Sequence, residues 1–254
     1  MPKKKDLKQL GSETAKGGFK NEQNVINRFN GWRKNKTAQK WLEAMNYDLG
    51  NIEYVKASKV RGQYKADIQV QIQISIKLKS QLDVQNLQVK LVSNPQGFNQ
   101  IDKRWIDKYV ELWSIPKDIA RYLKLFTGET KPRRKILRDS RRMFLTEMNK
   151  ATQSKIIDFF EDNKILVISD VLKGRGKFSA DWMLVILKMN NKSRWALKSI
   201  NEAMNIFGDG GVRITSQGSL KIGKISMQRK GGDAGRDTAK MLQFKINPVE
   251  LFND

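Results

Sequence analysis

The chain has 254 residues, with 49 Lys and Arg against 26 Asp and Glu, which gives a formal net charge of +23. This excess of positive charge indicates a polyanionic partner, nucleic acid first and an anionic membrane surface second. The absence of Cys and His excludes disulfides, Cys/His zinc sites, and catalysis by a His base or a Ser-His-Asp triad.

Two amphipathic helices are predicted near the N-terminus, after a basic leader. The first follows Gly17 and Gly18, a natural helix start, and the second begins near Thr37. The apolar residues of the first helix share one face: Phe19, Val25, Ile26, Phe29 and Trp32. Such spacing is typical of a helix that buries one side.

Two strands are predicted next, because apolar and polar residues alternate. The first spans residues 63–77 and carries Asp67 on its polar face, and the second spans residues 86–92 with Gln88 and Lys90 on its polar face. The apolar face of the second strand comprises Leu87, Val89 and Leu91. Each strand therefore has one side suited to a core.

The polar faces of these strands are expected to meet. Residues 80–85 are few enough for a hairpin connection, and antiparallel strands that share a core present their polar faces on the same side. Alternate residues on a strand lie roughly 6 to 7 Å apart. Asp67, Gln88 and Lys90 can then converge on one phosphate and one metal ion.

The segment after the second strand is expected to be an exposed turn around Gly97. A helix is predicted over residues 101–113, with Lys103 and Arg104 at its start as candidates for DNA contact. Its apolar residues at helical spacing are Ile101, Trp105, Tyr109 and Leu112 or Trp113. We interpret these aromatic residues as core rather than as a stacking surface.

The second half of the chain is predicted to be richer in strands. Helices are expected over residues 116–126, 152–163 and 200–207, and strands over residues 164–169, 181–189, 193–199, 212–215, 219–230 and 242–246. Between the first two helices, residues 127–144 are rich in Arg and Lys. They form either a loop that contacts phosphates or a charged connector, and we favour the first because guanidinium groups match phosphate oxygens.

A glycine-rich basic segment, residues 228–240, is the predicted site of base reading in the major groove. Its polar members are Gln228, Arg229, Lys230, Asp233, Arg236 and Lys240. Arg or Lys can bind guanine O6 and N7, and Asp can accept from cytosine N4, which is the set of contacts that a G·C site presents. Alternatively, Asp233 or Asp237 holds an Arg in place.

The order of Asp67, then Gln88, any residue and Lys90 resembles the PD-(D/E)XK nuclease core. Further stretches resemble the type II restriction endonucleases of the HinP type: GFKNE, KADI, NLQVKLVSNPQGFNQIDKRW, QRKGG, GRDTAKMLQFKI and ELF. Those enzymes cut GCGC and carry Gln where most of the superfamily has Asp or Glu. Ala66 departs from the superfamily motif, which has Pro there.

The resemblance implies Mg²⁺-dependent hydrolysis of a phosphodiester bond. Asp67 would be a direct metal ligand, with the side chain of Gln88 and the carbonyl of Val89 as further oxygen donors. Lys90 would stabilise charge that develops at phosphorus and assist the attacking water. Glu22 would supply an outer metal contact. On the residues alone, Asp67 is equally a solvated strand residue and Glu22 a charge on a helix surface.

The resemblance also implies that the turn enters the duplex. Phe98 and Gln100 would wedge between base pairs, where an aromatic ring recovers lost stacking and an amide bonds to base edges. Asn99 lies between them in the sequence and is a third candidate for DNA contact. The alternative is that Phe98 packs under its own loop.

The expected architecture is an α/β fold with a mixed central sheet flanked by helices, in one domain over residues 1–254. Residues 17–145 would form the catalytic part, and residues 146–254 mainly the part that recognises DNA and completes the sheet. Two sublobes around a DNA cleft also fit. The resemblance implies a type II restriction endonuclease, and the rivals are a DNA repair or junction nuclease and a non-catalytic nucleic-acid-binding protein with Asp67, Gln88 and Lys90 on its surface.

Double-stranded DNA is the expected partner, bound by a monomer or a homodimer. A restriction role further implies a DNA methyltransferase that protects the host genome. The longest apolar runs fall short of the roughly 20 residues that span a membrane, and the N-terminus lacks the apolar stretch of a signal peptide. We therefore expect a cytoplasmic bacterial protein.

Overall fold

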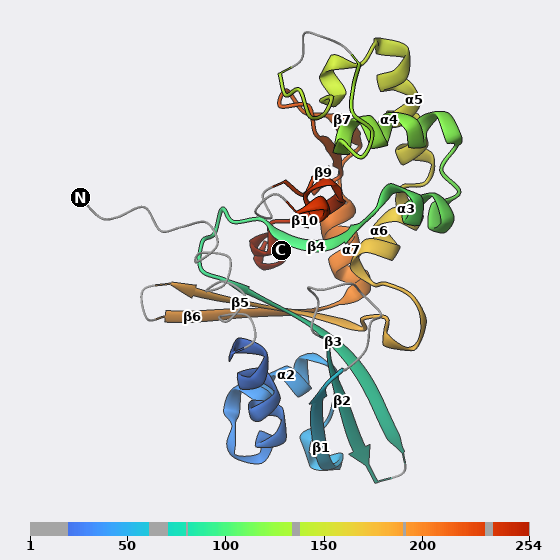
Figure 1. Cartoon of the computed structure of the whole chain (residues 1–254). Coiled ribbons are helices and arrows are strands. Elements are labelled where there is room, and N and C mark those ends of the chain that lie inside the picture. Colours follow the sequence, from blue (N-terminus) through green and yellow to red (C-terminus); the bar gives the residue numbers. More distant parts are fainter. Residues whose placement is uncertain are drawn as a thin grey trace, which may run out of the picture.

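The computed structural model describes residues 20–60, 71–79, 81–133, 138–189, 192–231 and 236–253. These residues form two five-stranded sheets, with strand orders β1-β2-β3-β5-β6 and β4-β10-β9-β8-β7. Figure 1 shows an elongated molecule, with the first sheet toward one end and β7 toward the other. The predicted residues Phe19, Asp67 and Asp233 lie outside the described residues, as does the first half of the strand predicted over residues 63–77.

The first sheet is mixed, as expected. Its strands are β1 (Ile52–Lys59), β2 (Gln71–Leu78), β3 (Leu82–Val92), β5 (Trp182–Met189) and β6 (Lys192–Ser199). β2 and β3 pair antiparallel, with Gln71 opposite Gln88, which confirms the predicted pairing. β3 pairs parallel with β5, with Lys90 opposite Val185. Strand β3, which carries Gln88 and Lys90, is therefore internal to the sheet.

One face of this sheet is covered by the predicted N-terminal helices. The first occupies residues 20–30, and α2 (Lys36–Ala44) begins at Asn35, whose side chain accepts a hydrogen bond from the Ala38 amide. The predicted apolar face is confirmed, because these residues are buried: Val25, Ile26, Phe29 and Trp32. They share a hydrophobic core with apolar residues of the sheet: Ile74, Ile76, Leu87, Val89 and Leu184.

The second sheet is antiparallel between every neighbouring pair of strands. Its strands are β4 (Asn99–Arg104), β7 (Val212–Ile214), β8 (Leu220–Ile222), β9 (Ile225–Arg229) and β10 (Leu242–Ile246). The helix predicted to start at residue 101 is wrong at its start, because residues 99–104 pair with β10 and the helix begins only at Ile106. Pairing with a distant strand has overridden the local helical spacing. Lys103 and Arg104 thus lie on a strand.

The helices around the second sheet are α3 (Ile106–Trp113), α4 (Lys117–Thr127), α5 (Lys150–Asp162), α6 (Lys164–Leu172) and α7 (Ile200–Gly208). Short 3-10 helices lie at Trp32–Lys34, Leu49–Asn51, Leu145–Glu147, Gly176–Phe178, Asp237–Lys240 and Pro248–Phe252. No described helix is long and apolar enough to span a membrane.

The strand predicted over residues 164–169 is wrong, because these residues form the first part of α6. A short apolar run does not distinguish a buried strand from a buried helix by its periodicity. As a helix, the segment buries Val167 and Ile168 but leaves the Ile165 side chain 81% exposed. Residues 219–230, predicted as one strand, form two antiparallel strands, β8 and β9. The other strands and helices predicted in this half are confirmed within the described residues.

A buried ionic network fixes β4 against α6. The Arg104 guanidinium lies 2.8 Å from the Asp170 carboxylate and 3.2 Å from that of Asp102. Asp170 also accepts hydrogen bonds from the Trp113 indole at 3.1 Å and from Arg175 at 2.7 Å. Burial alone would raise the pKa of Asp170, but Arg104 and Arg175 lower it. Asp170 therefore stays ionised and joins three elements.

Replacing Asp170 with Ala is expected to lower the free energy of unfolding by about 3 to 5 kcal/mol, because it leaves buried guanidinium charge uncompensated. Urea unfolding measures this loss. Asp118→Ala is the matched control, since Asp118 pairs with Lys155 on the surface and should unfold close to wild type. A wild-type unfolding midpoint for Asp170→Ala would refute a structural role for this network.

Candidate active site

Gln88 and Lys90 lie on the predicted polar face of β3, yet both are buried, with exposed fractions of 1% and 6%. Figure 1 shows β4 passing over this part of the first sheet. The Lys90 ammonium donates a hydrogen bond of 3.3 Å to the backbone carbonyl of Gln100 on β4. The interpretation of Gln88 and Lys90 as surface residues is therefore wrong.

Burying an amide and an ammonium costs free energy that apolar residues would not. On β5 the residues paired with Gln88 and Lys90 are Met183 and Val185, both fully buried. The two polar residues are thus paired with buried apolar residues of β5. Perturbed or buried ionisable groups in such a setting are candidates for function.

Glu22 reaches the same region from the first helix. Its side chain is 13% exposed and lies 3.4 Å from the Lys59 ammonium at the end of β1. Burial raises the pKa of Glu22, while the positive charges of Lys59 and Lys90 lower it. The side chain is thus largely buried rather than solvated, and its carboxylate lies near enough to Lys90 for the two charges to interact.

The described donors near Lys90 are all oxygens, which suit a hard cation such as Mg²⁺. They are the side chain of Gln88, the backbone carbonyl of Val89 and the carboxylate of Glu22. The described ranges contain no cluster of three or more His, Cys, Asp or Glu that could hold a metal. The described donor atoms are therefore of the type that Mg²⁺ prefers. The main carboxylate ligand would have to come from Asp67, which lies outside the described ranges.

The loop between β3 and β4 is the exposed turn that the sequence predicts. The Phe98 side chain is 48% exposed, and its ring centroid lies 5.0 Å from the Lys221 ammonium on β8. The Asn247 side chain donates a hydrogen bond of 2.9 Å to the carbonyl of Pro95. Phe98 is therefore not packed under its own loop, and the second sheet holds the loop at two points.

The remaining candidates around β4 differ in exposure. Asn99 and Gln100 are half-buried at its start, and the Asn99 side chain donates a hydrogen bond of 3.3 Å to the carbonyl of Leu91. Lys103 is only 7% exposed, and Arg104 belongs to the ionic network with Asp170. The prediction that Lys103 and Arg104 begin a helix is wrong, because both lie on β4.

The predicted base-reading segment folds back between β9 and β10. Gln228, Arg229 and Lys230 are half-buried on or next to β9, Arg236 is exposed, and Lys240 lies 2.9 Å from Asp237. Asp237 thus pairs with a Lys rather than fixing an Arg. The Arg229 guanidinium donates a hydrogen bond of 3.1 Å to the carbonyl of Ala239, which joins the two sides of the segment.

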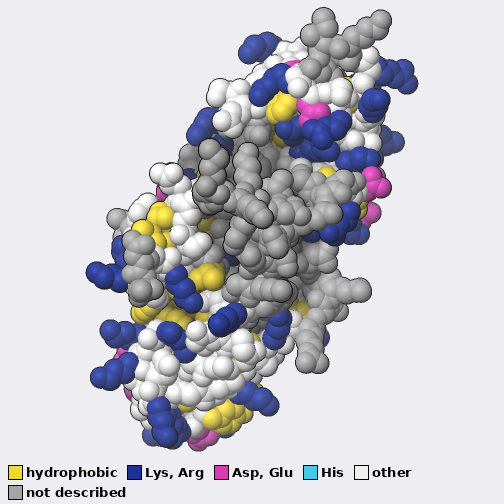
Figure 2. Space-filling model, turned by 60° about the vertical axis from the view of Figure 1, so that its left-hand side comes forward, with side chains coloured by type: hydrophobic (Ala, Val, Ile, Leu, Met, Phe, Trp, Pro, Cys, Tyr) yellow, Lys and Arg dark blue, Asp and Glu magenta, His cyan; other side chains and the backbone are white. Residues whose placement is uncertain are grey.

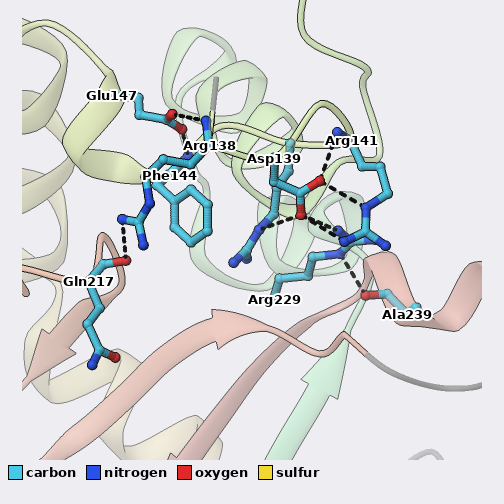
Figure 3. A network of polar contacts seen from close by, with 9 residues as sticks. Arg138, Asp139, Arg141, Phe144, Glu147, Gln217, Arg229 and Ala239 are labelled. Atoms are coloured by element: carbon cyan, nitrogen blue, oxygen red, sulfur yellow. Dashed lines mark hydrogen bonds and ion pairs between the residues drawn. The ribbon is translucent and has the colours of Figure 1, made fainter. Parts of the chain in front are cut away.

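Sequence reasoning missed Asp139, although it singled out the basic segment around it. The Asp139 carboxylate accepts two hydrogen bonds from Arg141, at 2.9 and 3.0 Å, and lies 4.0 Å from Arg229 (Figure 3). Hydrogen bonding by Arg141 is the main cause that lowers the pKa of Asp139 to about 2. An acidic residue isolated within a run of basic residues was the signal available in the sequence.

Comparison with known proteins gives one family and one fold. A family model described as R.HinP1I restriction endonuclease matches residues 45–252. The crystal structure of restriction endonuclease MspI in complex with its cognate DNA is similar, with a TM-score of 0.62 and 12% sequence identity over 88% of this chain and 87% of that chain. At this identity the likeness shows the fold alone. A search of curated proteins finds no match.

Phe98→Ala is expected to lower the free energy of unfolding by less than about 1 kcal/mol, because half of the ring is already in water. Urea unfolding tests this value. Phe244→Ala removes a fully buried ring in the second sheet and should cost about 3 to 5 kcal/mol. A loss at Phe98 as large as that at Phe244 would mean that the ring supports the fold.

Proposed function

The chain belongs to the R.HinP1I restriction endonuclease family, and we propose that this type II restriction endonuclease uses Mg²⁺ to hydrolyse double-stranded DNA at GCGC. The observation that carries the Mg²⁺-dependent mechanism is the burial of Gln88 and Lys90 side by side on β3. A solvated surface face would not bury an amide and an ammonium beside the apolar residues Met183 and Val185 of β5. The GCGC sequence rests on the resemblance of the chain to this family.

We assign the metal to Asp67, the side chain of Gln88 and the carbonyl of Val89, with Glu22 as an outer contact. When bound, Mg²⁺ polarises the phosphate and lowers the pKa of a coordinated water. Lys90 stabilises the negative charge that develops on the phosphate oxygens. Its hydrogen bond to the Gln100 carbonyl keeps the ammonium oriented before substrate arrives.

Gln88 makes this site less negative than one with two carboxylates. A neutral amide provides an oxygen donor without the large cost of burying a second charge. The site then attracts a dication less strongly through Coulomb forces. The nearby carboxylate of Glu22 supplies negative charge that compensates for the missing second carboxylate. This role would account for an acidic side chain in a largely buried position.

DNA recognition is assigned to residues 98–100, at the start of β4, and to residues of the segment 228–240. The proposed wedge comprises Phe98, Asn99 and Gln100, and the proposed base readers are Gln228, Arg229, Lys230, Asp233, Arg236 and Lys240. Lys103 is buried and Arg104 is bound by Asp170, so we rank them below the other residues proposed to contact DNA. Figure 2 shows Lys and Arg spread over one face of the molecule, with fewer Asp and Glu, which suits a long polyanion.

The proposed cellular setting is the bacterial cytoplasm, with a DNA methyltransferase of matching specificity protecting the host genome. A monomer that nicks each strand in turn and a homodimer that cuts both strands serve equally well on a palindrome. A repair or junction nuclease would share the catalytic residues but would leave ends with no fixed sequence.

The test of this function is to incubate the protein with unmethylated plasmid, in Mg²⁺ and in EDTA, and to sequence every end. Ends confined to GCGC and absent in EDTA are expected. Ends at another short palindrome would remove the GCGC assignment alone. Metal-dependent ends without sequence preference would favour the repair nuclease, and intact DNA that still binds would favour a non-catalytic protein.

Lys90→Met should lower the cleavage rate at least about 100-fold while DNA binding persists, because it removes charge stabilisation at phosphorus but nearly preserves side-chain volume. Asp67→Ala should abolish cleavage in the same way. The matched control is Lys77→Met, at the far end of the same sheet on β2. Single-turnover cleavage measures the rates, and loss of DNA binding by folded Lys90→Met would contradict the catalytic assignment.

A further inference from the structure

Three arginine side chains gather around one carboxylate, and a fourth shares an aromatic ring with one of them, in a part of the molecule that the catalytic proposal does not use. They are Arg138, Arg141, Arg142 and Arg229, and we call them, with Asp139, the arginine cluster. Arg141 binds Asp139 through two hydrogen bonds, while Arg142 and Arg229 lie 3.7 and 4.0 Å from the same carboxylate. One negative charge therefore faces three guanidinium groups.

An aromatic ring orders two of these arginines. The guanidinium carbon of Arg138 lies 4.2 Å from the Phe144 ring centroid, and that of Arg142 lies 4.0 Å from it. The two planar cations are thus both held close to a single ring. Because this contact already restricts their rotamers, a ligand that binds them causes little further loss of side-chain entropy. The Nε–H group of Arg142 is buried and donates to no hydrogen-bond acceptor among the described residues.

The backbone that carries the cluster is also held. Glu147 accepts hydrogen bonds from the amides of Arg138 and Phe144, at 2.8 and 2.7 Å, and Figure 3 shows this contact beside the arginines. The Leu145 amide donates a hydrogen bond of 3.0 Å to the carbonyl of Gly218, in the turn between β7 and β8. Gly218 has a φ of +82°, and a Cβ there would lie 2.6 Å from that of Phe144, so only Gly permits this approach.

The cluster is joined to the proposed base-reading segment. Arg229 is the last residue of β9, and its guanidinium donates a hydrogen bond to the carbonyl of Ala239 and lies 4.0 Å from the Asp139 carboxylate. A ligand that orders Arg141 and Asp139 therefore also fixes the end of β9. The same site connects a loop that follows α4 with the strand that leads into residues 230–240.

The charge of the cluster is unbalanced. Burial lowers the pKa of Arg142, and the positive charge of Arg229 lowers it further. Burial likewise lowers the pKa of Arg229, with Arg141 as the next cause. Like charges that repel one another in a partly desolvated place are stabilised by an added anion. In the folded protein, the positive charge of the arginine cluster thus exceeds its negative charge before any ligand binds.

We propose that the arginine cluster is a preformed binding site for a backbone phosphate of duplex DNA, which sets the position of residues 228–240 on the duplex. This inference rests on the proposed DNA-cleaving function and adds a contact that carries no base information. Guanidinium forks bind phosphate oxygens in pairs. Asp139 acts as a positioning residue, because its carboxylate orients Arg141 and Arg229 before DNA arrives.

The test is the affinity of Arg141→Gln for a duplex with GCGC and for one without it, measured in EDTA over a range of salt concentrations. Arg141 is 75% exposed, so the change should leave the thermal melting temperature nearly unchanged. We expect both duplexes to bind several-fold more weakly by the same factor, and the slope of log affinity against log salt to fall in magnitude by about 0.9. Arg138→Gln provides a second variant with the same expected result.

The matched control is Arg33→Gln. Arg33 is exposed and lies next to the N-terminal helices that cover one face of the first sheet, and its replacement should leave the DNA affinity and the salt slope as in wild type. Arg141→Lys retains the charge but loses the paired hydrogen bonds, and its affinity should lie between those of wild type and Arg141→Gln.

Wild-type affinity and slope for folded Arg141→Gln and Arg138→Gln would overturn the inference, as would a loss confined to the GCGC duplex, which indicates base reading. If the wild-type protein cuts plasmid and these variants bind DNA with wild-type affinity, the phosphate site is refuted but the nuclease function is not. A different outcome is that wild-type protein binds DNA but never cuts it, while the variants show a smaller slope of log affinity against log salt. That outcome would refute the proposed nuclease function and support the phosphate site.

Discussion

The hydrogen bond from the Lys90 ammonium to the Gln100 carbonyl joins the two sheets at the place where the chain passes from one to the other. Lys90 lies near the end of β3, and Gln100 lies near the start of β4, which belongs to the other sheet. The contact buries a charged side chain and gives it one orientation. The proposed chemistry of β3 and the proposed wedge at Phe98 are therefore separated by only a few residues of chain.

β4 can fulfil this role because both its ends are held. At its start, Asn99 bonds to the carbonyl of Leu91, and at its end Arg104 is bound by the buried carboxylate of Asp170. The strand between them pairs along its length with β10. A loop with an exposed aromatic ring is thus mounted on a rigid support, which is the condition for a side chain that has to enter a duplex without losing its position.

Much of the fold could be predicted from local patterns, and the exceptions share a cause. The alternation that predicts β2 and β3 reflects their real faces, but β1 was missed because a register shift near Ile52 and Tyr54 breaks its alternation. Residues 99–104 and 164–169 were misassigned because β10 and the surrounding core decide their structure. Gln88 and Lys90 were identified by their spacing, yet their burial depends on β4, whose position no local pattern encodes. Asp139 and Asp170 act through partners far away in the sequence, Arg229 and Arg104.

The pairing of β4 with β10 also determines when the site can be complete during synthesis. Among the described strands, β4 occupies the edge of its sheet, and its neighbour there is β10, residues 242–246. The parallel neighbour of β3 is likewise made late, at residues 182–189. A ribosome that has finished β3 and the Phe98 loop has therefore produced the residues of the site without the strands that bury them. The order of translation thus keeps the proposed catalytic strand unassembled until residues 242–246 have emerged.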